Sequence, residues 1–344
     1  MTSIIADYEF CEPNGSAQIA IRDQMLQEIL RPGGAMPYPI AAEYPLVLAP
    51  SRTNRSLCIA RRPVSAGREG INFLAHANIL LRKMEPAQLP GLAPAGAGIK
   101  VALVGNVATA PDERGKGLMR KLMDEVESRA RAQGADAIVL WSDLSDFYQK
   151  LGFSAGGNEI RMTLSVRKLD SGKVPFIWVP EGAVSDEHIA RMLELRATGF
   201  RKPLYQIERS IAEFRELLGI PDLALIFACR GNFPAGKAPQ AGDIQSFFIV
   251  GKGADMQGVI HEWGTSDMQL LMNAAGAIAG NAGLGELMIL VPPSTDTTRI
   301  ELLTKASVKR ETHPMAWVKI LSPERKTLVE LAFNEGFIWG LDSI

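Results

Sequence analysis

The stretch that decides the fold of this chain reads Val107-Ala108-Thr109-Ala110-Pro111-Asp112-Glu113-Arg114-Gly115-Lys116-Gly117-Leu118-Met119. A β-like run over residues 99–109 leads into this tight basic turn, and an amphipathic helix follows at once. A helix start presents unpaired backbone N–H groups and about half a positive charge. Glycines at 115 and 117 let an anion approach the main chain without meeting a Cβ, and Arg114 and Lys116 add charge. The stretch therefore predicts a cradle for a phosphate.

The spacing of this cradle resembles the Arg/Gln-x-x-Gly-x-Gly/Ala motif of the GNAT superfamily of acyl-CoA-dependent N-acetyltransferases. Arg114 and Gly117 fill the first two defined positions, and Met119 stands where Gly or Ala is usual. That departure is also tolerated in groups that resemble the Eis aminoglycoside acetyltransferases. The resemblance implies that the pyrophosphate of coenzyme A is wrapped by Arg114, Gly115, Lys116, Gly117, Leu118 and Met119. It also implies that the pantetheine arm extends like an added strand along the backbone of Val107, Ala108 and Thr109.

Two other interpretations of the cradle were weighed. A P-loop of the form Gly-x-x-x-x-Gly-Lys-Ser/Thr fails at both ends, because position 110 is alanine and Gly117 follows Lys116 where a hydroxyl is required. A purely structural glycine turn stays open from the motif alone.

Composition narrows the class of protein. A length of 344 residues predicts two domains of ordinary size, and 47% hydrophobic with 22% charged residues is typical of a soluble globular protein. The net charge of −1 argues against a nucleic-acid partner held by bulk electrostatics. The cysteines lie far apart without a C-x-x-C pair, so neither a disulfide framework nor a zinc site is expected. Without a signal peptide or a long apolar run, we expect a cytoplasmic protein with no membrane contact and no metal. A homo-oligomer remains possible.

Both halves of the chain run in one predicted order of helices, three strands, helix, strand, helix, strand. The first half has a helix over 16–30 and later elements over 57–61, 71–82, 99–109, 116–133, 137–141, 145–151 and 159–166. The second half has elements over 185–196, 207–218, 224–228, 245–250, 258–263, 266–279, 286–291, 298–307 and 315–321. We therefore predict an α/β (α+β) fold of two tandem GNAT-like domains, residues 1–168 and 175–344. Each would be a mixed, mostly antiparallel sheet flanked by helices.

The second half lacks a phosphate cradle. The corresponding turn reads Gly264-Thr265-Ser266-Asp267-Met268-Gln269, without a basic residue or paired glycines, and Asp267 would repel a pyrophosphate. We therefore expect one acetyl-CoA site per chain, in the first half.

Three residues are candidates for catalysis. Tyr148 lies in a segment that resembles the Tyr-x-x-x-Gly-Phe ending of the short helix over many GNAT coenzyme sites. The resemblance implies that Tyr148 protonates the departing thiolate. The alternative is a tyrosine that only packs in the core. His76, on the polar face of a strand with Asn72 and Asn78, and Glu262, at a strand end, are candidate bases. A lone strand histidine is more often structural. Eis-like enzymes place their chain terminus near the active site after a third domain, and that role is not carried to Ile344.

These observations predict an enzyme that moves an acetyl group from acetyl-CoA to a primary amine by direct attack in a ternary complex. The acceptor, a small-molecule or peptide amine, would enter a cleft bounded by both halves. The floor of the cleft would be the polar face of the strand that holds Asn72, His76 and Asn78, and Glu262 is the candidate for its far wall. The alternative is a non-catalytic acyl-CoA-binding sensor or regulatory module. A tandem-GNAT transferase that uses a tRNA-linked donor is disfavoured by the near-neutral charge.

Overall fold

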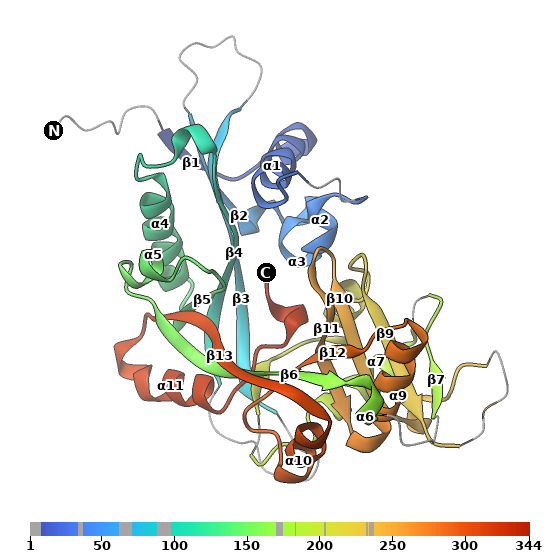
Figure 1. Cartoon of the computed structure of the whole chain (residues 1–344). Helices are drawn as coiled ribbons and strands as arrows, with labels where there is room; N and C mark the ends of the chain where they lie inside the picture. Colours follow the sequence, from blue (N-terminus) through green and yellow to red (C-terminus); the bar gives the residue numbers. More distant parts are fainter. Residues whose placement is uncertain are drawn as a thin grey trace.

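The computed structural model describes residues 8–33, 37–61, 71–87, 98–169, 175–182, 184–202, 204–231, 233 and 237–344. One sheet of thirteen strands runs through this part of the chain, with helices packed on it (Figure 1). Its strand order is β1-β2-β3-β4-β5-β13-β6-β12-β11-β10-β9-β7, and β8 pairs with β3. Among these strands only the pairs β4–β5 and β11–β12 are parallel. The predicted mixed α/β class with a mostly antiparallel sheet is therefore confirmed.

The strands are β1 (Tyr8–Cys11), β2 (Ser56–Arg61), β3 (Phe73–Pro86), β4 (Ile99–Thr109), β5 (Ala137–Leu140), β6 (Ser154–Ser165), β7 (Phe176–Trp178), β8 (Tyr205–Ile207), β9 (Ala224–Cys229), β10 (Ile244–Lys252), β11 (Asp255–Thr265), β12 (Glu286–Val291) and β13 (Ser307–Ile320). The helices are α1 (Gly15–Leu30), α2 (Ile40–Glu43), α3 (Pro45–Leu48), α4 (Leu118–Ala132), α5 (Ser145–Gln149), α6 (Val166–Leu169), α7 (Asp186–Arg196), α8 (Ile211–Leu217), α9 (Met268–Asn281), α10 (Thr297–Ala306) and α11 (Lys326–Asn334). Short 3₁₀ turns lie at Pro50–Arg55, Pro111–Glu113, Ala241–Asp243, Pro323–Arg325 and Gly340–Asp342.

Helix α4 forms because its sequence places one apolar stripe at helical spacing. Leu118, Leu122, Met123, Val126 and Ala130 are buried. The opposite side carries i,i+4 ion pairs, Glu125–Arg129 at 3.0 Å and Glu127–Arg131 at 2.7 Å. The stripe packs on the face of the sheet to which Ala102 and Val104 of β4 belong, whereas Val101 and Leu103 belong to the core on the other side. Strand β4 is therefore buried on both faces, at the centre of the first lobe.

The two halves of the chain exchange strands where they meet. We predicted that residues 159–166 would close the first half, but this strand, the end of β6, pairs with β12 of the second half, Met162 opposite Ile289. Strand β13, from near the end of the chain, lies between β5 and β6 and pairs Val318 with Val139. In Figure 1 these two long strands cross the middle of the molecule and join a lobe of β1–β5 to a lobe of β9–β12. The expectation of a first sheet closed by its own last strand is therefore wrong.

No helix in the described ranges is both long enough and apolar enough to cross a bilayer.

Candidate active site

The parallel strands β4 and β5 separate at their carboxyl ends. Their pairing runs from Val101 opposite Ala137 to Val104 opposite Leu140, and β4 then continues to Thr109 while the chain leaves β5 at Trp141. The other side of β4 stays paired with β3, with a register shift between His76 and Asn78. Asn106 lies in this bulge with a left-handed φ of 46°. The backbone of residues 105–109 thus has one edge that no described strand covers, and a cavity of about 490 Å³ opens there.

The predicted phosphate cradle lies directly after this open edge. Gly115 and Gly117 both have φ of 77°, a left-handed conformation that favours glycine, and the space where a Cβ would stand is empty at each. Gly117 is the N-cap of α4 and no side chain caps the helix. The described chain therefore supplies no side-chain acceptor at this helix start, which leaves an N-terminal set of donors for an anion. Arg114 is exposed beside it.

A buried carboxylate braces the cradle. Glu113 is 5% exposed. It pairs with Arg61 of β2 at 2.6 Å and with Lys116 at 3.1 Å. Lys116 is therefore partly neutralised by its neighbour. Among the described residues, the Arg114 side chain makes one long hydrogen bond, 3.4 Å from its Nε to the Thr109 carbonyl. Arg114 is the freer cation for a phosphate.

The equivalent position in the second half is closed, as the sequence predicted. Strands β11 and β12 are parallel there, Ile260 opposite Ile289, and α9 follows β11. The carboxylate of Asp267 caps α9, accepting a hydrogen bond of 3.1 Å from the backbone N–H of Leu270. Arg230 pairs with the same carboxylate. A carboxylate of the chain itself thus occupies the helix start that is left open in the first half.

Tyr148, on the short helix α5, lines the cavity at the strand separation together with Val104 to Val107. Its ring packs edge-on against Phe147 and Phe153, with centroids 5.1 Å and 5.6 Å away. Burial raises the pKa of Tyr148 to about 12, so the hydroxyl stays protonated at neutral pH. The ring of Tyr148 is therefore packed, as the structural alternative expects, and its residue also brings a protonated hydroxyl group to the cavity.

His76 has no exposed surface. Its Nδ1 lies 2.9 Å from the carbonyl oxygen of Asn106, so Nδ1 carries the proton, and Nε2 has no partner in the described chain. Asn78 donates to the Asn106 side-chain oxygen at 2.6 Å. Burial lowers the pKa of His76 to about 3, which keeps the ring neutral. These surroundings favour a role in holding the Asn106 bulge, and they do not place His76 or Asn78 on the floor of an open cleft.

Glu262 is also without exposed surface and lies in a cluster of four buried charges. Arg209 donates to its two oxygens at 2.8 Å and 3.2 Å, and the Nε of Arg196 lies 3.2 Å away. Both arginines also contact Asp342, each at 2.8 Å. Burial would raise the pKa of Asp342, but Arg209 and Arg196 outweigh it and hold this pKa below its usual range. Glu262 lines neither of the two cavities at the junction of the lobes, so these surroundings do not support a base role for it.

Below, "the tail" means residues 340–344, whose end lies against β4 at Gly105. Lys252 donates to the carbonyl of Gly340 at 2.9 Å and to the Ser343 hydroxyl at 2.9 Å, and it also contacts the Ser343 carbonyl. Burial lowers the pKa of Lys252 to about 8. Ile344 lies so close to Gly105 that a Cβ added there would stand 2.0 Å from the Ile344 oxygen. The sequence analysis did not predict where the tail lies. The one feature of the sequence that indicates a buried position is the apolar run Phe337-Ile338-Trp339 just before the tail.

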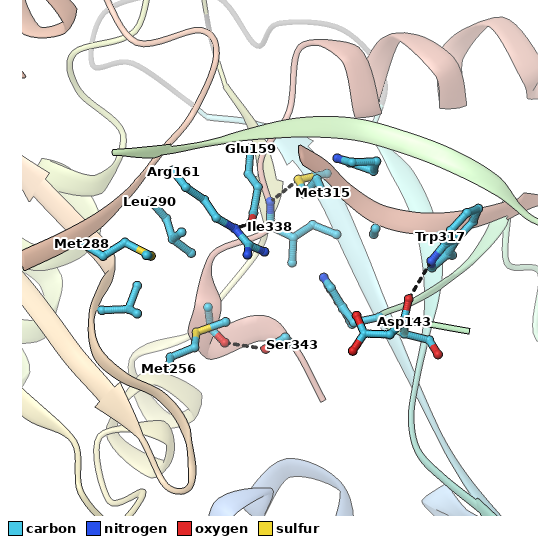
Figure 2. A pocket seen from close by; sticks show the side chains of 16 residues that line it. Asp143, Glu159, Arg161, Met256, Met288, Leu290, Met315, Trp317, Ile338 and Ser343 are labelled. Carbon is cyan, nitrogen blue, oxygen red and sulfur yellow. Dashed lines mark hydrogen bonds and ion pairs between the residues drawn. The ribbon is translucent and has the colours of Figure 1, made fainter. Parts of the chain in front are cut away.

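A second cavity, of about 380 Å³, adjoins the first. The two share Trp141, Ser142, Asp143, Met256 and Ser343. Strands β6, β11, β12 and β13 supply the other walls, so both halves line it (Figure 2). A cavity bounded by both halves is therefore present, but none of the residues expected at the floor and far wall of the acceptor cleft lines it. The described residues include no group of three or more His, Cys, Asp or Glu side chains placed to hold a metal ion.

Comparison with known proteins agrees with this geometry. Residues 92–156, which hold the end of β4, the cradle and α5, match the family model of the GNAT acetyltransferase domain. The resemblance found in the sequence is thus confirmed over this part of the chain. No curated protein matches the sequence.

Solved structures share the fold over most of the chain. A GCN5-related N-acetyltransferase from Kribbella flavida is 17% identical with a TM-score of 0.60, over 93% of this chain and 73% of that one. Eis1 from Mycobacterium abscessus is 12% identical with a TM-score of 0.54, over 94% and 76%. N-myristoyltransferase from Saccharomyces cerevisiae with bound myristoyl-CoA is 11% identical with a TM-score of 0.51, over 92% and 82%. At these identities the likeness concerns the fold.

Proposed function

We propose that this protein is an acetyl-CoA-dependent N-acetyltransferase that acts on a primary amine, with one coenzyme site in its first half. One observation carries the proposal: in the part of the chain that the structure describes, no strand covers the edge of β4 at residues 105–109, and no side chain caps the helix start that follows. The first feature suits an extended pantetheine arm and the second suits a pyrophosphate. The closed helix start at Asp267 supports a single site per chain.

In this proposal the cradle residues Arg114 to Met119 bind the diphosphate, with Arg114 as the free cation. The backbone of Val107, Ala108 and Thr109 holds the arm, and one of its N–H groups polarises the acyl oxygen, on which negative charge develops as the amine attacks. His76 and Asn78 fix the Asn106 bulge, so that these donors are already in place before binding.

Tyr148 is proposed to give its proton to the departing sulfur. A hydroxyl whose pKa lies near 12 is protonated at every physiological pH, and Tyr148 lines the same cavity as residues 104–107 of β4. The amine loses its proton to solvent or to a group at the shared mouth of the two cavities. Glu262 is proposed as a structural residue.

Calorimetric titration with acetyl-CoA tests the coenzyme site. We expect one site per chain, and we expect binding to be lost in the double variant Arg114→Glu, Gly117→Asp. Arg131→Glu, at the far end of α4, is the matched charge control and should bind normally. Two equivalent sites, or binding that survives the double variant, would contradict the proposal.

Turnover separates the enzyme from a non-catalytic acyl-CoA-binding module. With acetyl-CoA bound, release of free thiol should depend on added primary amine. Tight binding of acetyl-CoA together with no thiol release across a broad set of amines would favour the binding module.

A further inference from the structure

We propose that the 380 Å³ cavity beside the coenzyme site selects an acceptor with a single ammonium group and an apolar body, such as an alkylamine or arylalkylamine. This inference rests on the proposed function and adds the chemical class of the acceptor to it. The volume lies within the range of small-molecule pockets.

The walls of this cavity are largely apolar. They comprise Trp141, Met256, Val259, Met288, Leu290, Pro314, Met315, Ala316, Trp317 and Ile338. Methionine side chains adapt their shape to a guest, and the two tryptophans offer flat apolar surface. Trp317 is fixed by a hydrogen bond of 2.9 Å from its Nε1 to the Ser142 carbonyl. A ligand that filled this cavity would gain affinity mainly through the transfer of its apolar surface out of water.

The charges of the cavity add up to one negative charge. Glu159 is buried and pairs with Arg161 at 2.6 Å, so these two largely cancel. Asp143 is exposed and has no hydrogen-bond or ion-pair partner among the described residues. It also lines the coenzyme-side cavity, which places its carboxylate where the two cavities join. One free carboxylate at the junction suits one ammonium group there.

Figure 2 shows how these groups are arranged. Asp143 lies beside Trp317 at one end, Met288 and Leu290 lie at the other, and Arg161 with Glu159 stands between them. An amine bound at the Asp143 end therefore points its apolar body away from the coenzyme site. A polycation such as an aminoglycoside or a polyamine would need several carboxylates, and its further charges would meet the methionine wall unpaired.

A long acyl chain of the donor is the competing occupant. It would favour an uncharged channel, whereas this cavity holds three ionisable side chains, Asp143, Glu159 and Arg161. The amine is therefore the occupant that the charges favour, and the experiment includes donors of both lengths.

The test measures kcat/KM for propyl-, butyl-, pentyl- and hexylamine with acetyl-CoA, using the full chain. Burial of one methylene group stabilises a complex by about 0.8 kcal/mol, so we expect kcat/KM to rise roughly fourfold per carbon. Spermidine and an aminoglycoside should react more slowly than hexylamine. Met288→Trp fills the apolar end and should abolish the rise with chain length while propylamine still reacts. Leu284→Trp, at an exposed position before β12, is the matched control and should keep the rise.

A second readout does not depend on turnover. Hexylamine added with free coenzyme A should change the tryptophan fluorescence, and Trp317→Phe should reduce that change. Asp143→Asn should raise the KM for hexylamine up to about fivefold, the range of an exposed ion pair, and leave acetyl-CoA binding intact.

The outcomes separate this inference from the proposed function. A kcat/KM that does not rise with the length of the alkylamine would overturn the acceptor class, and so would faster turnover of spermidine or the aminoglycoside. Neither result would contradict the proposed acetyltransferase activity. A preference for octanoyl-CoA over acetyl-CoA that Met288→Trp removes assigns the cavity to the acyl chain and also overturns it. Thiol release with no amine at all, despite acetyl-CoA binding, overturns both.

Discussion

Replacing Glu262 by glutamine tests directly whether this carboxylate is a base or part of the frame. In the four-charge cluster, two arginines face two carboxylates, and every side chain is at most 2% exposed. Glu262→Gln removes one negative charge and leaves one buried guanidinium uncompensated. Loss of one partner of a buried ion pair costs about 3–5 kcal/mol. The free energy of unfolding should therefore fall by that amount, and the melting temperature by on the order of 10 °C.

The assay combines urea unfolding with kinetics on the protein that remains folded. Acetyl-CoA affinity should stay within about twofold of the parent, because the cradle belongs to the other lobe. Glu286→Gln, an exposed carboxylate at the start of β12, is the control and should change stability by less than about 0.5 kcal/mol. If Glu262→Gln keeps the parent's stability but loses turnover a hundredfold, the structural assignment is refuted and Glu262 is a proton acceptor.

Three further changes have defined outcomes. Tyr148→Phe should keep acetyl-CoA affinity and stability within about 1 kcal/mol but lower turnover about a hundredfold, and an unchanged rate would reduce Tyr148 to packing. Gly105→Ala should push Ile344 from β4, cost about 1–3 kcal/mol in urea unfolding and lower amine turnover more than coenzyme affinity; a crystal structure with the tail in place would contradict this. Burial lowers the pKa of His76 to about 3 and of His261 to about 4, so the unfolded chain binds more protons below pH 6.5. The contribution of these two histidines to the free energy of unfolding should thus be fully present above pH 6.5 and fall by about 2.7 kcal/mol per pH unit towards pH 4. In urea unfolding, His76→Gln should halve this pH dependence.

The glycine turn at the start of α4 could be predicted from sequence because its signal is local. Gly115 and Gly117 sit in a left-handed turn that few other residues accept, and the apolar stripe of α4 follows immediately. The closed second site could be predicted for the same reason, since Asp267 precedes the helix that it caps. The predicted elements over 16–30, 57–61 and 137–141 correspond closely to α1, β2 and β5.

Pairings between distant segments could not be predicted. Residues 307–314 of β13 include the charged run Lys309-Arg310-Glu311, so no apolar alternation marked them as a strand. Strands β7 and β8 have three residues each, too few for a periodic signal. Nothing local indicates that Ile344 meets Gly105 or that Glu262 meets Arg209.

The surroundings of His76 and Glu262 also depend on contacts far away in sequence. The spacing of polar residues suggested that His76 faces an open cleft, but the bulge at Asn106 turns a carbonyl towards its ring. A polar residue on a strand can face solvent or complete a buried network, and only the neighbouring strands decide between the two.

The exchange of β6 and β13 has a consequence for how this protein is made. Strand β5 gains its β13 neighbour only after residue 320 has been synthesised, although β5 itself is complete at residue 140. Until then the nascent first lobe carries an unpaired edge, Ala137–Leu140, in which every side chain is apolar and buried in the finished protein. The usual order, in which the first domain folds while the second is being translated, is therefore blocked at this edge. The sheet can therefore close only after residues 317–320 have left the ribosome.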